Sequence, residues 1–118
     1  MGFRFERLKI WKESVKFASE IYALTEAFPR GEQFGLISQL RKAAVSISLN
    51  IAEGEGRHSD ADLSRFIRIA IGSLNEVVTL LHISRGRYIT EEKFKYFYTR
   101  CEQISKMLHA FRNYLRTK

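Results

Sequence analysis

The chain has 118 residues, of which 45% are hydrophobic, 13% aromatic and 28% charged. This length suits one domain, and so high an apolar fraction excludes a disordered chain. A single cysteine, Cys101, excludes an internal disulfide framework and a cysteine-based metal cage. No uninterrupted apolar run reaches the roughly 18–20 residues of a membrane span, and the first residues lack the apolar stretch of a signal peptide. We therefore expect one cytoplasmic globular domain over residues 1–118.

The charge balance is strongly basic. Lys and Arg number 20 against 13 Asp and Glu, which gives a net charge of +7 and an isoelectric point near 9.8. Residues 89–118 supply four of these seven net charges. A pI above about 9 makes nucleic acid a candidate partner. The alternative is that the positive surface serves only solubility.

Glycine and proline divide the chain into four apolar-periodic segments. Pro29 with Gly31 marks one break, Gly54 with Gly56 a second and Gly86 a third. Between these breaks apolar residues recur every three or four positions, which is helical spacing, and no segment alternates with the period of a strand. The predicted helices cover residues 6–28, 33–54, 60–85 and 91–116.

Each helix presents an apolar stripe along one face. In the first, we expect the inward stripe to be Leu8, Trp11, Val15, Ala18, Tyr22 and Thr25, with Ile10, Phe17, Ile21, Leu24 and Phe28 beside it. In the third, the stripe is Leu63, Ile67, Ala70, Leu74, Val77 and Leu81. Four such helices with short connections predict an all-α, antiparallel up-down-up-down four-helix bundle.

Helix-end signals agree with the breaks. Ser59 followed by Asp62 has the spacing of a capping box, and Thr90 is suited to cap the last helix. Arg85 and Gly86 fit the end of the third helix.

The third predicted helix carries a second apolar stripe, and the first predicted helix shows the same feature. In the third helix this stripe consists of Phe66, Ile69, Ile71, Val78, Leu80 and Ile83. A helix that is apolar over most of its circumference is buried on more than one side, so we expect a homo-oligomer. The alternative is that these residues flank a broad core.

The sequence offers no catalytic or metal-binding constellation. His58, His82 and His109 are far apart and have no partners at metal-ligand spacing. Cys101 falls on the core stripe of the last helix, where a buried thiol is expected rather than a nucleophile. No nucleotide-binding glycine motif is present. We expect a non-enzyme without cofactor or metal.

The end of the second helix is unusual because it combines small and polar residues. Asn50 and Glu53 lie one turn apart and share a face, so they are able to bond jointly to one partner. We expect both to be buried or interfacial, with a structural role in fixing the bundle register and closing the helix end.

This region also carries a family resemblance. The matching runs are Phe34-Gly35-Leu36, Gln39-Leu40-Arg41-Lys42-Ala43-Ala44, Ser46-Ile47, Asn50-Ile51-Ala52-Glu53-Gly54 and Gly56-Arg57 with Ser59. With further pieces between about residues 5 and 115, the chain resembles the four helix bundle family, also called 23S rRNA-intervening sequence proteins. Ser48 replaces a frequent proline and Lys42 a usual arginine, so the charge at position 42 is kept while the planar fork is lost.

The resemblance implies a bacterial protein without enzymatic activity. Accessory proteins of diversity-generating retroelements are similar bundles that form basic, ring-shaped pentamers and bind nucleic acid and a reverse transcriptase. It therefore implies a pentamer that binds RNA or DNA. The candidate phosphate contacts are Arg41, Lys42, Arg57, Arg65 and Arg68, and the motif residues with a structural role are Gln39, Asn50, Glu53 and Gly54. The alternative is a scaffold that binds another protein and has no direct contact with nucleic acid.

Overall fold

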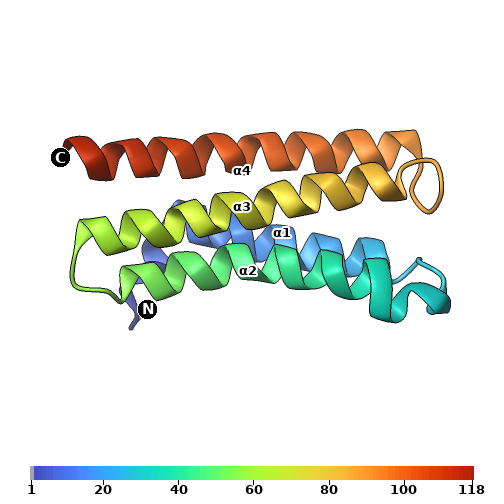
Figure 1. Ribbon diagram of the computed structural model, residues 1–118, viewed down its shortest axis with the longest axis horizontal. Helices are drawn as coiled ribbons and strands as arrows, with labels where there is room; N and C mark the ends of the chain where they lie inside the picture. Colours follow the sequence, from blue (N-terminus) through green and yellow to red (C-terminus); the bar gives the residue numbers. More distant parts are fainter. Residues whose placement is uncertain (1) are drawn as a thin grey trace.

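Four long helices run along one axis, and each is antiparallel to the helix before it in the sequence (Figure 1). The computed structural model describes residues 2–118, and no strand occurs within that range. The predicted all-helical four-helix bundle is confirmed. The helices are α1 (Lys9–Thr25), α2 (Ser38–Glu55), α3 (Asp60–Ser84) and α4 (Glu91–Thr117), with short 3-10 turns η1 (Arg4–Arg7) and η2 (Arg30–Glu32) and a π-helical turn η3 (Gln33–Ile37).

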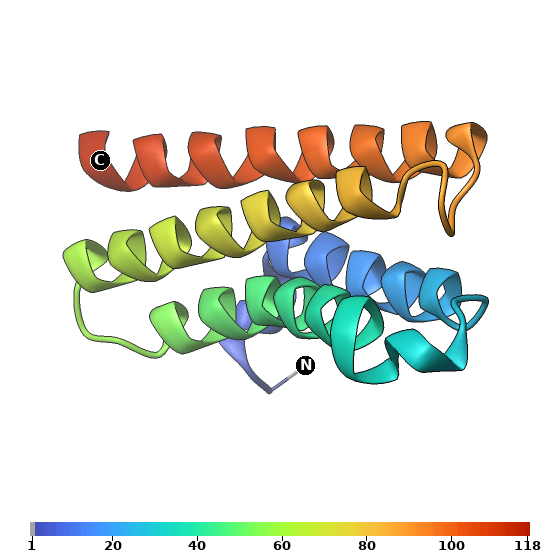
Figure 2. The same ribbon diagram turned by 45° about the vertical axis from the view of Figure 1, so that its right-hand side comes forward.

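The four helices are not equally packed against one another. α2 and α3 form the most extensive pair, followed by α3 with α4 and α1 with α2, whereas the neighbouring helices α1 and α4 pack together less extensively (Figures 1 and 2). One cause is length, since α1 has 17 residues and α4 has 27. The bundle is accordingly elongated, with extents of 44 × 24 × 22 Å.

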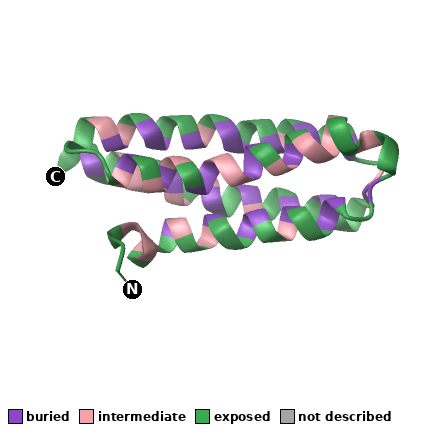
Figure 3. Ribbon diagram, turned by 90° about the horizontal axis from the view of Figure 1, so that it is seen from below, coloured by how far each residue is buried: buried purple, intermediate pink, exposed green. Residues whose placement is uncertain are grey.

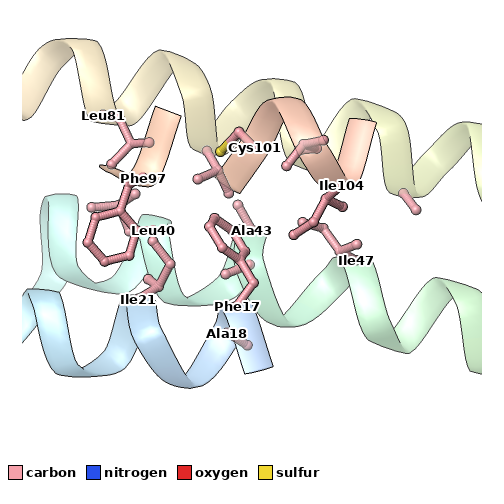
Figure 4. Close-up of a cluster of buried hydrophobic side chains, with 14 of the residues drawn as sticks. Phe17, Ala18, Ile21, Leu40, Ala43, Ile47, Leu81, Phe97, Cys101 and Ile104 are labelled. Carbon is pink, nitrogen blue, oxygen red and sulfur yellow. The ribbon is translucent and has the colours of Figure 1, made fainter. Parts of the chain in front are cut away.

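The core is built from all four helices. Phe17 and Ile21 of α1 meet Leu40 of α2 and Phe97 and Ile104 of α4 in one continuous apolar cluster (Figure 4). Every member of the stripe predicted for α3 is buried, as expected from its regular spacing.

The inward stripe expected for α1 is wrong in part. Val15 and Tyr22 are exposed, at 38% and 44%, whereas the neighbouring Phe17 and Ile21 are fully buried. Both sets have helical spacing, so periodicity did not distinguish them. The buried set is the one that joins the core shared with α2 and α4.

The boundaries of the first two helices also differ from the prediction. Leu8 is extended, with ψ 124°, and separates η1 from α1. The second helix does not run smoothly from residue 33, because Gly35 has a non-helical backbone (φ −109°, ψ −110°) within the π turn.

The helix ends carry the anticipated caps. The Ser59 hydroxyl accepts the backbone N–H of Asp62 at 3.1 Å, and that of Thr90 accepts the N–H of Lys93 at 3.2 Å. Gly86 has a φ of +75°, which favours glycine at the turn after α3.

The second apolar stripe of α3 serves the core in part. Phe66 and Leu80 are buried within the chain, while Ile69 and Ile83 remain 42% and 54% exposed. Figure 3 shows buried positions alternating with exposed ones along the helices. Among the described residues, one helix, α3, is long and apolar enough to cross a membrane, with a mean hydropathy of 1.4 over its most apolar stretch. Its packing between α2 and α4 accounts for the part of this apolar stretch that is buried.

One polar cluster joins the sparsely packed α1 and α4. Arg100 on α4 donates from Nη1 to Glu13 Oε1 at 3.2 Å and from Nε to Glu20 Oε1 at 3.0 Å. The Tyr96 hydroxyl also donates to Glu20. Because the Arg100 side chain is only 11% exposed, its charge depends on these two carboxylates for compensation.

Candidate nucleic-acid interface

A glycine allows α2 and α3 to approach each other closely near their connection. Gly54, in the last turn of α2, is buried, and a Cβ there would lie 2.7 Å from Cβ of Phe66 and 2.9 Å from Cδ1 of Leu63. Only a residue without a side chain permits this approach. The structural assignment of Gly54 in the sequence motif therefore has a direct geometric reason.

Two guanidinium groups lie against the Phe66 ring at this end of the bundle. The Cζ atoms of Arg57 and Arg65 are 4.9 Å and 4.7 Å from the ring centroid, within the range of cation–π attraction. Arg57 is also paired with Glu53, from Nη2 to Oε2 at 3.1 Å. Arg68 follows Arg65 by one turn and is exposed.

Arg65 and Arg68 form no ion pair among residues 2–118. Together with Arg57 they make up the α2–α3 basic cluster, which presents two uncompensated positive charges to solvent. Acidic residues are close in sequence, since Asp60 and Asp62 occupy the first turn of α3, where the helix dipole favours them.

Arg41 has a different environment. Its Nε donates to Thr25 Oγ1 at 2.8 Å, its Nη2 donates to the Tyr22 carbonyl at 3.3 Å, and its Cζ lies 4.5 Å from the centroid of the Tyr22 ring. It thus adds a donor to a carbonyl that already accepts the N–H of Glu26 in the last turn of α1, and ties α1 to α2. The Arg41 guanidinium group therefore already has partners within the protein, and no pattern in the sequence indicated these partners.

Lys42 is exposed and forms no ion pair within the described part of the chain. It lies 15 positions before Arg57, so the two are separated by about 22 Å along α2 at the standard helical rise. The five basic candidates therefore occupy two places on the surface, with Arg41 and Lys42 at one end of α2 and the α2–α3 basic cluster at the other.

Asn50 and Glu53 do not share a partner. The Asn50 amide donates to the carbonyl and the hydroxyl of Ser46, at 2.8 and 2.9 Å, and the Ser73 hydroxyl of α3 donates to the same Ser46 Oγ at 2.9 Å. Asn50 is half-buried, so its structural role in an α2–α3 polar link is supported.

Glu53 is not buried within the chain, which leaves an interfacial position as the remaining part of the expectation. It is exposed in the chain and pairs with Arg57, one turn along. Gln39, the remaining motif residue, is also exposed. Position on a shared helix face did not predict burial, because α3 covers only the side of α2 that carries Gly54.

No nucleophile or metal cluster emerges from the described residues. Burial raises the pKa of the Cys101 thiol to about 12, so it stays protonated and unreactive at neutral pH. His58, His82 and His109 are exposed and belong to different segments. Within residues 2–118 no three His, Cys, Asp or Glu side chains gather as metal ligands.

Sequence reasoning missed two features at the opposite end of the bundle. The Tyr88 hydroxyl donates to Glu32 Oε2 at 2.7 Å, which ties the α1–α2 connection to the α3–α4 loop. This hydrogen bond, with that from the Leu36 amide, lowers the pKa of Glu32.

The second feature is Phe34, which was noted only as part of a motif and is 91% exposed. The sequence offered no clear signal for this exposure, because it depends on the π turn η3.

Comparison with known proteins identifies related sequences and a related fold. A family model described as 23S rRNA-intervening sequence protein matches residues 6–110. A solved structure of a protein of unknown function from the S23 ribosomal protein family of Bacteroides thetaiotaomicron superposes with a TM-score of 0.81 at 27% sequence identity, covering 88% of this chain and 95% of that one. No curated protein matches the chain.

Proposed function

Since the chain belongs to the 23S rRNA-intervening sequence protein family, we propose that it is a non-catalytic, basic homo-oligomer that binds nucleic acid through the phosphate backbone. The observation that carries the proposal is the presence of exposed cations without carboxylate partners. Lys42, Arg65 and Arg68 are of this kind among the described residues. Such groups are free to replace the counterions around phosphates.

Two further features support a charged assembly. Leu49 is 61% exposed, and Ile69 and Ile83 of α3 are also exposed, which leaves apolar surface for a second subunit. A ring of five copies, the number implied by the family resemblance, multiplies the net charge of +7 fivefold. Light scattering at micromolar concentration tests the assembly, and a mass near 13.8 kDa would contradict it.

Phosphate contacts of this kind carry little sequence information. We therefore expect micromolar, weakly selective binding at physiological salt, in the cytoplasm where RNA and DNA are accessible. The test is an anisotropy titration with structured RNA, single-stranded RNA and duplex DNA at about 50 and 200 mM salt, between which phosphate contacts lose strength steeply.

A charge-matched pair of variants localises the contacts. Replacing Arg65 and Arg68 together by glutamine should reduce the slope of log K against log salt on duplex DNA by about 1.8, or about 0.9 per phosphate contact. The control replaces Lys12 and Lys16, which are exposed on α1, by glutamine and should change the slope much less. If both variants change the salt slope equally, binding depends on the net charge of the protein and not on the position of these arginines. No binding at the lower salt would favour the protein-scaffold alternative.

A further inference from the structure

The π-helical turn η3 places one aromatic side chain in solvent. Within it, Gly35 leaves the helical backbone, and the Glu32 carboxylate accepts the N–H of Leu36 at 3.3 Å, which fixes the turn. Leu36 and Ile37 then face the core, while Phe34 is 91% exposed, more than any other large hydrophobic residue described. The turn lies at the right-hand end of Figure 1, in teal. Folding alone gives no reason for an aromatic ring there.

Phe34 borders a shallow hollow at the α1–α2 corner. The hollow has a volume of about 380 Å³, and its wall includes Tyr22, Ile37, Arg41 and Lys42. Two cations and no carboxylate line it. We call it the Phe34 hollow. Its volume lies within the range of pockets that hold small ligands.

The two cations of the hollow have different freedom. The Arg41 Cζ atom lies 4.5 Å from the centroid of the Tyr22 ring, and its Nε is hydrogen-bonded to Thr25. The positive charge of Arg41 therefore has a fixed position in the wall of the hollow. Lys42 is exposed and unpaired within residues 2–118, so its ammonium group is able to reach an anion. The Phe34 ring has no aromatic or cationic neighbour among the contacts of the described chain.

We propose that the Phe34 hollow binds an unpaired nucleotide of a single-stranded nucleic acid, with the base stacked on Phe34 and a phosphate on Lys42. An open aromatic face beside a positive groove is the combination with which proteins bind single strands, because every base has a face that stacks. Paired bases are already stacked within a duplex and do not reach the ring. This inference rests on the proposed function and adds a preference for single strands.

The lining of the hollow favours an anionic occupant, because it carries two cations and no carboxylate. Self-association through Phe34 remains a distinct outcome of the test.

The first experiment compares Phe34→Ala with Phe3→Ala, which removes another exposed phenylalanine, 66% accessible, outside the hollow. Affinity for a single strand should fall on the order of tenfold or more for Phe34→Ala, while affinity for a duplex of the same sequence stays unchanged. Phe3→Ala should behave as the parent in both titrations. Single-stranded RNA and DNA are run as separate arms to show which sugar is preferred. Because Phe34 is exposed, the circular dichroism spectrum of the variant should be unchanged.

The second experiment reports stacking directly. Trp11 is the only tryptophan, so a Trp11→Phe, Phe34→Trp protein carries a single indole in the hollow. Its fluorescence should be quenched by a single strand and not by an abasic strand of the same length and charge. Lys42→Gln should lower the salt slope on single strands by about 0.7, the loss of one phosphate contact.

Each other result has a definite reading. Undiminished single-strand binding by Phe34→Ala, with salt-dependent binding intact, overturns the inference and leaves the proposed function standing. Equal losses on single strands and duplex, or a reduced mass in light scattering with nucleic-acid binding unchanged, would make Phe34 an assembly contact and also overturn it. If the parent protein binds no nucleic acid at about 50 mM salt, both proposals fail.

Discussion

Gly54→Ala introduces a single methyl group where α2 and α3 are closest. The new Cβ would lie 2.7 Å from Cβ of Phe66, 2.9 Å from Cδ1 of Leu63 and 3.4 Å from Cα of Leu63. The Leu63 methyl is able to rotate away, but Cβ of Phe66 and Cα of Leu63 move only with the backbone of α3. The substitution therefore has to displace one helix from the other.

The expected loss follows from two opposing contributions. Overpacking of a close core contact costs about 2–3 kcal/mol when backbone must shift. Replacing glycine by alanine within a helix returns about 1 kcal/mol. The free energy of unfolding should therefore fall by about 1–2 kcal/mol.

Gly72→Ala is the matched control, because Gly72 lies within α3 and a Cβ there meets nothing within 4 Å. This variant should gain up to about 1 kcal/mol from helix propensity alone. Urea unfolding followed by circular dichroism, at one protein concentration for all variants, measures both changes. A Gly54→Ala protein as stable as the parent, with Gly72→Ala stabilised as expected, would refute the argument that close approach requires this glycine.

Three further predictions follow from other contacts. Arg41→Lys keeps the charge but loses the fork that bonds α1 to α2, so urea unfolding should show a loss of about 1–2 kcal/mol; no loss would contradict its structural role. The pKa of Glu32 is lowered by the Tyr88 hydroxyl and the Leu36 amide, so its carboxylate stabilises the fold above the unfolded pKa and loses that contribution as the pH falls. Glu32→Gln should therefore weaken the pH dependence of stability below about pH 4.3, and an unchanged acid titration of unfolding would count against the link. The Cys101 thiol should react with an aromatic disulfide reagent at neutral pH only after denaturation, whereas rapid reaction of the folded protein would show that it is accessible.

Most of the fold could be predicted from the sequence, since its regular features are local. The stripe of α3 was predictable because steps of three and four leave one consistent face, and the caps at Ser59 and Thr90 depend on residues three positions apart. The inward face of α1 was ambiguous because two apolar stripes are adjacent. Which of them is buried depends on the shape of α2 and α4, and local spacing does not contain that information.

The candidate site was less predictable, because its determinants are contacts between distant residues. Arg41 bonds to Thr25, 16 positions away, and Tyr88 to Glu32, 56 positions away. Helical periodicity gives no access to such pairs. The exposure of Phe34 likewise depends on a π turn, which is rare and has no simple sequence pattern.

The Arg100 cluster has a consequence for the handedness of the bundle. Four helices joined in this order have two possible arrangements, which differ in the side of the other three helices on which α1 lies. The burial of apolar side chains distinguishes only weakly between these two arrangements. Arg100 is 11% exposed and pairs with Glu13 across 87 positions. In a bundle of the opposite turn this guanidinium would lose both of its carboxylates, because Glu13 and Glu20 reach it from α1. Ion pairs that add little to the stability of the native bundle thus favour the observed arrangement over its mirror topology.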